Sequence, residues 1–453
     1  MRTKRFWGAA AATLMTAALL TGCSTSTSGG QGNATGGGKS LDGIKWPTYK
    51  GSTTLTVWDW TPDTKYIPLF KKMYPNIKIN LQNVGGGSVE YAKLTTADAA
   101  GSGAPDDVRI EYPYVPQFIA SKSLTDISTL VKPQLAQLPA SALSQVSSGS
   151  GIYDFPQNGG TLGLIYRPDV LQKYKLAVPT SWTEFAQSAR ALHKANPKMY
   201  MTYFPNNDPE HVMGLVQQAG VQAFKQATDG SWTVNIDNPQ SRALMSMWGG
   251  LISDGAVKVQ ADFTPEWQSA IVAGDYAMYT APEWFAGNVL APYLPKGQQK
   301  FTITTLPSWT AGQTVVGNWG GSGYAVPSQS KSKQAAALFA AFMDLGAANA
   351  EIKNGTLPEA NTLTRYPNYA KTAGTVPGFS QSVVQTYQGI KQKAQAVDPS
   401  VHFSPWTTVL NNSLNSEEAK AVAGTIPWSD VLRNVQAAVV SYAKSQGATI
   451  RVG

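Results

Sequence analysis

Three side chains suited to ligand binding stand together where a predicted strand ends. Residues 54–58 alternate with a period of two, which is typical of a strand, and Trp58, Asp59 and Trp60 close it. In open α/β sheets, ligands bind beyond the carboxyl ends of the strands. An indole ring can stack on the C–H face of a sugar, and a carboxylate accepts hydroxyl protons. We expect at least one of the three to contact ligand; the alternative is that one tryptophan belongs to the core.

Similar combinations of aromatic, acidic and amide side chains recur along the chain. Carboxylates accept hydroxyl protons, asparagine both donates and accepts, and glycine lets the backbone approach a ligand closely. The competing interpretations are core rings, solvated loop acids and an asparagine-rich turn. The further candidates are Glu111 and Tyr112 at the end of a strand predicted over 107–112, Asp154, Asn206, Asn207, Asp208, Glu283, Trp284, Trp319, Gly320, Gly321, Glu359 and Trp406.

Composition favours binding over catalysis. The chain has 13 Trp and 19 Tyr with only 14% charged residues, and such rings suit sugar sites. His193, His211 and His402 are its only histidines, and no cluster has metal-ligand spacing, so we expect no metal and no cofactor. A secreted glycoside hydrolase using two carboxylates stays open as an alternative, although no motif places two acids at facing strand ends.

The N-terminus has the three parts of an export signal. Basic residues precede an apolar run over 6–20, which is short for a membrane span, and a small-residue zone follows. Leu20-Thr21-Gly22-Cys23 resembles the bacterial lipobox, which implies a signal peptide over 1–22 and a lipid on Cys23, the only cysteine. Residues 23–45 begin with a Ser/Thr/Gly-rich stretch and are expected to form a flexible tether. Removing the three basic residues of 1–22 lowers the net charge from +8 to +5.

The body of the chain predicts layered α/β architecture. Short β-branched strands alternate with amphipathic helices, and a mature chain of this length suggests two lobes. Ser181 to Glu184 form a capping box that predicts a helix start, and Thr264-Pro265 predicts another, which Gly274 ends. No basic run is interleaved with aromatic residues, so nucleic acid is not an expected partner.

Seven of these segments, in this order, resemble the family 1 extracellular solute-binding proteins, the maltose-binding-protein-like sugar receptors of ABC importers. Each segment alone is weak evidence for the family, but together the segments cover nearly the whole mature chain. The segments are Leu55–Trp60, Tyr74–Ile79, Gly103–Val108, Leu164–Val170, Pro179–Phe185, Ala273–Met278 and Gly320–Pro327.

The resemblance implies a two-lobe, type II periplasmic-binding-protein-like fold with a ligand cleft between the lobes. The expected lobes are 46–157 with 320–356 and 158–319 with 357–453. The chain is expected to cross between them near 154–160, 316–321 and 355–361, where a few residues could absorb the φ/ψ change of closure.

The resemblance therefore implies a monomeric lipoprotein on the extracytoplasmic face of a cell membrane. The Gly/Ser-rich tether favours the surface of a Gram-positive cell. Such a lipoprotein captures a mono- or oligosaccharide and delivers it to the permease subunits of an ABC transporter. A polyamine or a peptide remains an alternative ligand, since acids and aromatic rings suit a polyamine nearly as well as a sugar.

Overall fold

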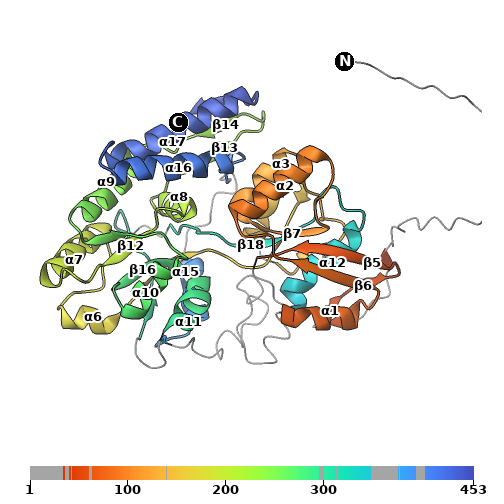
Figure 1. Cartoon of the computed structure of the whole chain (residues 1–453), viewed down its shortest axis with the longest axis horizontal. Helices are drawn as coiled ribbons and strands as arrows, with labels where there is room; N and C mark the ends of the chain where they lie inside the picture. Colours follow the sequence, from red (N-terminus) through yellow and green to blue (C-terminus); the bar gives the residue numbers. More distant parts are fainter. Residues whose placement is uncertain are drawn as a thin grey trace, which may run out of the picture.

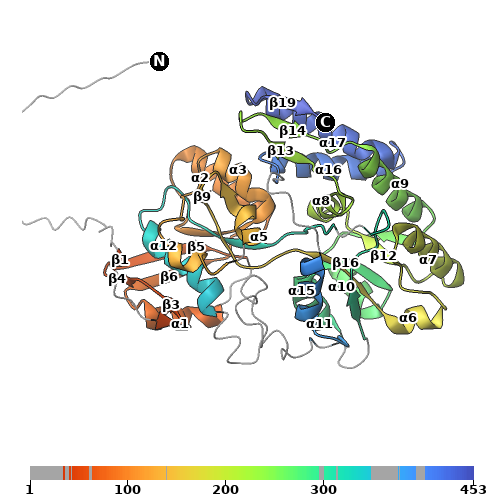
Figure 2. The ribbon, with the colours of Figure 1, turned by 180° about the vertical axis from the view of Figure 1, so that it is seen from behind.

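The computed structural model describes residues 34–35, 40–41, 43–60, 64–138, 140–294, 300–312, 315–347, 376, 378–393 and 403–453. The chain forms two α/β lobes that lie side by side, joined by strands running through the middle (Figures 1 and 2). About 45% of the chain is helical and 20% is strand, which confirms the predicted α/β class. Within the described residues, no helix is both long and apolar enough to cross a membrane.

The first lobe is built on a five-stranded mixed sheet with the order β10-β18-β7-β5-β6. β5 pairs in parallel with β6 and β7, whereas β18 pairs antiparallel with β7 and β10. The carboxyl ends of β5 and β7 therefore reach the same edge of the sheet. The strands are β5 (Thr53–Trp58), β6 (Ile77–Gln82), β7 (Asp107–Glu111), β10 (Phe155–Pro156) and β18 (Ser322–Ala325).

Helices cover both faces of this sheet. Phe70 of α1 and Phe339 of α12 pack together in the core on one face, with ring centroids 5.2 Å apart. Tyr91 of α2 and Phe118 of α3 belong to a separate core on the other face. The helices of this lobe are α1 (Ile67–Met73), α2 (Ser88–Ala100), α3 (Val115–Ala120), α4 (Lys132–Leu135), α5 (Ala140–Leu143) and α12 (Lys333–Ala341).

The second lobe surrounds one large core between small sheets. The sheet β16-β11-β17 is antiparallel, β12 and β15 are parallel, and β13-β14-β19 brings the last strand of the chain beside residues 232–234. The strands are β11 (Leu162–Tyr166), β12 (Thr202–Phe204), β13 (Phe224–Gln226), β14 (Trp232–Val234), β15 (Val257–Val259), β16 (Met278–Pro282), β17 (Thr302–Thr304) and β19 (Ile450–Val452).

Long helices form the outside of the second lobe, and α16 and α17 pack across it beside α8 and α9 (Figure 1). The predicted helix signals are confirmed: Ser181 and Glu184 form a reciprocal capping box, Thr264 caps α10, and Gly274 ends it in the left-handed conformation. The helices are α6 (Pro168–Lys173), α7 (Trp182–Ala195), α8 (Pro209–Gln218), α9 (Pro239–Ser253), α10 (Pro265–Ala273), α11 (Ala291–Tyr293), α15 (Val383–Lys393), α16 (Thr407–Val422) and α17 (Val431–Ser445).

Short elements complete the described chain. They are β1 (Ala34–Thr35), β2 (Ser40–Leu41), β3 (Ile44–Lys45), β4 (Thr48–Tyr49), β8 (Ser147–Ser148), β9 (Gly151–Ile152), the 3₁₀ turns η1 (Thr64–Tyr66), η2 (Tyr112–Tyr114), η3 (Ser144–Val146) and η7 (Trp428–Asp430), and the π-helical turns η4 (Phe285–Leu290) and η5 (Phe342–Gly346).

Two segments connect the lobes and run against each other. The chain leaves β10 and enters β11 over 157–161, and it returns to β18 over 316–321. The Gly160 amide donates to Asn318 Oδ1 at 3.1 Å, and the Trp319 amide donates to the Gly160 carbonyl at 2.7 Å. The predicted third crossing at 355–361 lies outside the described residues, and the lobe boundaries stay a prediction.

Candidate functional site

A cavity lined by residues of both lobes lies between them. Its wall combines a proline of the first lobe, one face of α8, one residue of the returning segment, and the beginning of α16. The lining residues are Pro113, Glu210, Met213, Gln217, Ala223, Phe224, Asn318, Phe403, Ser404, Thr407, Leu410 and Asn411. A space bounded by both lobes is where closure could enclose a small ligand.

Glu210 connects this cavity to a group of aromatic and glycine residues. Asp208 caps α8 by accepting from the amides of Glu210 and His211, and Pro209 occupies the first turn. The cap therefore fixes the backbone position of Glu210 in the first turn of the helix. A Cβ built on Gly320 would lie 3.8 Å from Glu210 Oε2 and 3.9 Å from the Trp284 ring. The bare Gly320 backbone, the carboxylate and the indole therefore border one small space.

Hydrogen bonds hold the two tryptophans of this space in place. Trp319 Nε1 donates to Asp208 Oδ2 at 2.9 Å, and Trp284 Nε1 donates to the Trp319 carbonyl at 3.4 Å. The two rings meet edge to face, with centroids 5.5 Å apart. Trp319 is buried and Trp284 is half-buried, so Trp284 is the ring with a surface left to offer a ligand.

Three carboxylates from opposite lobes have raised pKa values here. Burial raises the pKa of Glu111, at the end of β7, to about 7, and the charge of Asp208 adds to the effect. Burial also raises the pKa of Asp208 to about 6. The pKa of Glu210 lies well above its usual range because of burial and the charges of Glu111 and Asp208. Asp208 is compensated by its hydrogen bonds from Trp319 and the amides of α8, whereas Glu210 is a poorly compensated group that a hydroxyl or a cation could stabilise.

Glu210 has the most acceptor capacity in this group. Its side chain is nine-tenths buried, and its carboxylate makes no hydrogen bond within the described part of the chain. Glu111 differs, because Tyr91 donates its hydroxyl to Glu111 Oε2 at 3.0 Å. A ligand donor placed beside Gly320 would therefore meet Glu210 without displacing a protein hydrogen bond.

The two glycines of the returning segment have positive φ values, +70° at Gly320 and +90° at Gly321. Only glycine adopts these without strain. At Gly321, a Cβ would also come within 2.7 Å of the Tyr112 ring. Tyr112 is fully buried and donates its hydroxyl to the Asn158 carbonyl, so it packs on the crossing segments and does not offer a face to the cavity.

Three other predicted residues are buried inside the first lobe and interact with residues of that lobe. Trp58 is 8% exposed and donates its Nε1 to Gln82, while Asp59 is 1% exposed and accepts from the Tyr324 hydroxyl at 2.6 Å. Asp154 is fully buried, because its carboxylate lies against Gly323 of β18 inside the sheet. Burial raises its pKa well above the usual range. We leave these three out of the proposed ligand set.

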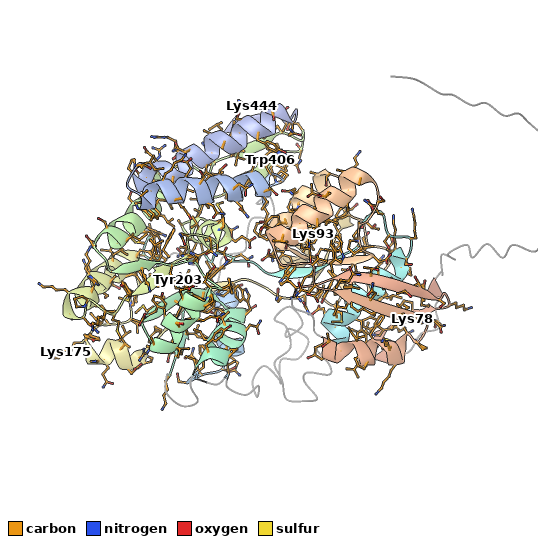
Figure 3. All side chains as sticks on the ribbon, in the orientation of Figure 1. Lys78, Lys93, Lys175, Tyr203, Trp406 and Lys444 are labelled. Atoms are coloured by element: carbon orange, nitrogen blue, oxygen red, sulfur yellow. The ribbon has the colours of Figure 1, made fainter. Side chains whose placement is uncertain are left out.

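The remaining predicted residues differ in their exposure to solvent. Trp60 is half-buried edge-on to Tyr91, Glu283 and Asn206 are half-buried, and Asn207 is exposed. Trp406 lies at the end of α16 that faces the first lobe (Figure 3), but it is 9% exposed and packs edge-on against Trp232. Glu359 and Cys23 lie outside the described residues.

Of the predicted residues that the structure describes, none lines the cavity itself. The sequence analysis missed Asn318, which directly precedes the predicted Trp319. It also missed Glu210, which lies two residues after the predicted Asp208. The pattern Asp208-Pro209 could have located Glu210, because it is a helix cap with proline in the first turn, and helix N-termini at an α/β edge suit ligands. Among the described residues, no group of three His, Cys, Asp or Glu could hold a metal ion.

Residues 58–344 match the model of the bacterial extracellular solute-binding protein family. This stretch is more than half of the chain, so the chain belongs to that family, and the resemblance carried by the seven segments is confirmed.

Two characterised relatives carry sugar-related names. The chain is 24% identical over 306 residues to the arabinooligosaccharide-binding protein of Bacillus subtilis (strain 168), covering 64% of this chain and 69% of that protein. It is also 24% identical over 303 residues to the lactose-binding protein of Rhizobium radiobacter, covering 63% and 69%.

Solved structures show the same two-lobe fold. An ABC transporter associated binding protein from B. animalis subsp. lactis Bl-04, in complex with β-1,6-galactobiose, gives a TM-score of 0.77 at 22% identity, covering 88% of this chain and 100% of that one. The galacto-N-biose/lacto-N-biose I-binding protein of the ABC transporter from Bifidobacterium longum, in complex with lacto-N-biose, gives 0.75 at 20% identity, covering 89% and 100%. The predicted type II two-lobe fold is confirmed.

Proposed function

We propose that this protein captures a mono- or oligosaccharide outside the cell membrane and delivers it to the permease subunits of an ABC importer. The observation that carries the proposal is the space bordered by Glu210, Trp284 and Gly320 between the two lobes. A carboxylate without a hydrogen bond can accept hydroxyl protons, an indole can stack on a sugar face, and a bare backbone admits the ring between them.

The energetics suit reversible capture. A hydrogen bond to an ionised acceptor contributes about 1.5–3 kcal/mol, and an aromatic contact adds about 0.5–1.5 kcal/mol beyond the area it buries. Three such bonds with one stacked ring total about −8 kcal/mol, which corresponds to a micromolar dissociation constant. The ligand is bound and released unchanged, since the three acids act as acceptors and not as a general acid and base.

The proposal includes a lipid anchor on Cys23 after removal of residues 1–22, which would hold a monomeric receptor on the extracytoplasmic face. A Cys23→Ser variant expressed in a bacterial host should move from the membrane fraction to the soluble extracytoplasmic fraction. Retention of this variant in the membrane fraction would show that something other than the lipid anchors the protein.

Calorimetric titration of residues 46–453 with galactose, β-1,6-galactobiose, lactose and an arabino-oligosaccharide tests the ligand class. We expect binding of at least one saccharide, at least a tenfold weaker affinity in Trp284→Ala, and no new reducing ends after long incubation. Release of reducing ends would show that the protein is a glycoside hydrolase and not a receptor. Exposed Tyr442 on α17 provides a control, because Tyr442→Ala should bind like the wild type.

A polyamine is the second candidate ligand, and the negative charge that Asp208 and Glu111 place beside Glu210 favours it. Bound ammonium groups would neutralise these acids, whereas a neutral sugar would not. Titration with spermidine at low and high salt separates the two ligand classes. Salt-sensitive spermidine binding that disappears in Glu210→Gln, without binding of any saccharide, would assign the site to polyamines.

A further inference from the structure

The wall of the cavity between the lobes offers a ligand mostly hydrocarbon. Met213 of α8 and Phe403 are half-buried there, and Phe403 also packs against the core of the first lobe. A saccharide carries hydroxyls over most of its surface, so a wall of this kind does not match a sugar ring. The apolar residues of the wall are Pro113, Met213, Ala223, Phe224, Phe403 and Leu410.

The polar side chains of the wall, apart from Glu210, already bond to other parts of the protein. The bonds run from Thr407 Oγ1 to the Pro113 carbonyl, from Asn411 Nδ2 to the Tyr114 hydroxyl, from Asn318 Nδ2 to the Gly320 carbonyl, from the Asn318 amide to Gln217 Oε1, and from the Trp406 amide to Ser404 Oγ. A ligand hydroxyl in this part of the cavity would have to displace such a bond or stay unpaired. An unpaired buried hydroxyl lowers affinity about tenfold or more.

The apolar wall begins close to the carboxylate that borders the space beside Gly320. Glu210, Met213 and Gln217 all line the cavity, and their spacing of three and then four residues places them on one face of α8. Met213 lies about 4.5 Å beyond Glu210 along the helix axis, at 1.5 Å per residue. A group attached directly to a sugar that bonds to Glu210 would therefore reach the Met213 side chain.

The wall gives a charged substituent no counter-charge. Among the described residues that line the cavity there is no Lys or Arg, and Glu210 is the ionisable side chain on the wall. A phosphate or carboxylate on the sugar would meet the like charge of Glu210. A neutral hydrocarbon group is the substituent that this wall suits.

We propose that the Met213 side of this cavity binds a hydrocarbon substituent of the ligand, an alkyl or aryl group linked through oxygen to the sugar, so that the protein prefers a glycoside to the free sugar. This inference rests on the proposed function. The driving force is the removal of apolar surface of both partners from water, which grows with the area buried. The unbranched thioether of Met213 can adapt to the shape of such a group.

The test compares free sugars with their glycosides on the full-length protein. Calorimetric titration measures the affinities for galactose, glucose and arabinose and for the methyl and phenyl glycosides of each. For at least one sugar, we expect the affinity to rise from the free sugar to the methyl and then to the phenyl glycoside, with the phenyl glycoside at least about tenfold tighter than the free sugar. The heat capacity change of binding should become more negative in the same order.

Variants of Met213 show whether the apolar wall causes this preference. Met213→Gln keeps the length of the side chain and its helix propensity but places an amide on the wall, so the affinity ratio of phenyl glycoside to free sugar should fall to within about twofold of one. Met213→Leu stays apolar and should keep the ratio of the wild type. Met247→Gln is the matched control, because Met247 is a half-buried methionine on α9 of the same lobe and does not line the cavity.

The other outcomes distinguish this inference from the proposed function. If the wild type binds a free sugar as tightly as its phenyl glycoside, or if Met213→Gln keeps the ratio of the wild type, the hydrocarbon site is refuted and the sugar receptor remains. If Met213→Gln does not fold, Met213→Ala replaces it, because the shorter side chain should also reduce the ratio. A wild-type protein that binds none of the sugars and none of the glycosides overturns both the hydrocarbon site and the proposed function.

Discussion

Two groups of carboxylates stand in very different surroundings in this protein. The first group, Asp59, Glu90, Asp107 and Asp154, is almost completely buried in the first lobe, around the single guanidinium of Arg109. The second group, Glu111, Asp208 and Glu210, lies between the lobes beside the cavity. The first is enclosed by its own lobe, whereas the second is shared between the two lobes. We infer that the first group serves the fold and the second serves the ligand.

The largest expected effect comes from removing the cation of the first group. Arg109 lies 3.7 Å from Asp59 and lowers the pKa values of Glu90 and Asp154 against the effect of burial. Arg109→Leu should destabilise the protein by about 3–5 kcal/mol, because it leaves buried acids without a counter-charge. Denaturant unfolding measures this. The exposed pair Arg190–Asp254 supplies the control, since Arg190→Leu should cost at most about 1 kcal/mol.

The next largest effect is on saccharide affinity, which should differ between variants of the two carboxylate groups. Glu210→Gln should weaken saccharide binding about 10- to 100-fold, because one acceptor oxygen becomes an NH₂ donor and a buried ligand hydroxyl loses its partner. Asp154→Asn, from the buried group, should leave the affinity within twofold of the wild type. Calorimetric titration of both variants with the same saccharide checks the difference. Equal losses in the two variants would mean that the two groups do not have separate roles.

A smaller effect concerns pH. Glu111 has a pKa of about 7 and Glu90 one of about 9, both raised mainly by burial from an ordinary value near 4.5. A carboxyl with a raised pKa stabilises the fold fully below its unfolded pKa, and that contribution is lost as pH rises through the folded pKa. Stability should therefore fall from pH 5 to 9.

The variants divide this pH range between the groups. Glu111→Gln should flatten the fall between pH 5 and 7 and leave the slope between pH 8 and 9 unchanged. Glu90→Gln should flatten both intervals. Melting temperatures measured in buffers of constant ionic strength give the slopes. A Glu111→Gln profile parallel to that of the wild type at every pH would show that this carboxyl titrates normally.

The fold could largely be predicted from the sequence because its signals are local. The capping box at Ser181, the cap at Thr264 and the left-handed ending at Gly274 each depend on residues within one turn. One boundary differed for a local reason as well. The strand predicted over 107–112 ends at Glu111, since Pro113 has no amide to donate and Tyr112 already belongs to a 3₁₀ turn.

The lining of the cavity could not be predicted, because it joins residues that are distant in the sequence. Pro113, Glu210 and Thr407 meet there only after both lobes and α16 are in place. The roles of the acids depend on equally distant partners. Asp154 lies next to aromatic residues in the sequence, as a sugar-binding acid might, but the neighbour that encloses it is Gly323.

The smallest expected effect lies where α16 of the second lobe bonds directly to the first. Gln117 Oε1 accepts from the amide and the hydroxyl of Thr408, at 3.0 and 2.8 Å, on an exposed surface. These bonds exist only while the lobes are close, so they favour the closed form. Gln117→Ala should weaken ligand binding about two- to tenfold, since the two exposed bonds share one acceptor atom and together contribute about 0.5–1.5 kcal/mol.

The same substitution should increase the radius of gyration of the ligand-free protein in small-angle X-ray scattering and leave its melting temperature nearly unchanged. Gln137→Ala is the matched control, because Gln137 is half-buried in the same lobe, as Gln117 is, and its side chain donates to the nearby Pro133 carbonyl. If both variants bind like the wild type, the contact between α16 and the first lobe does not bias closure. In that case the ligand alone would bring Glu111 of the first lobe toward Glu210 of the second, and the separate roles of the two acid groups would rest on ligand binding.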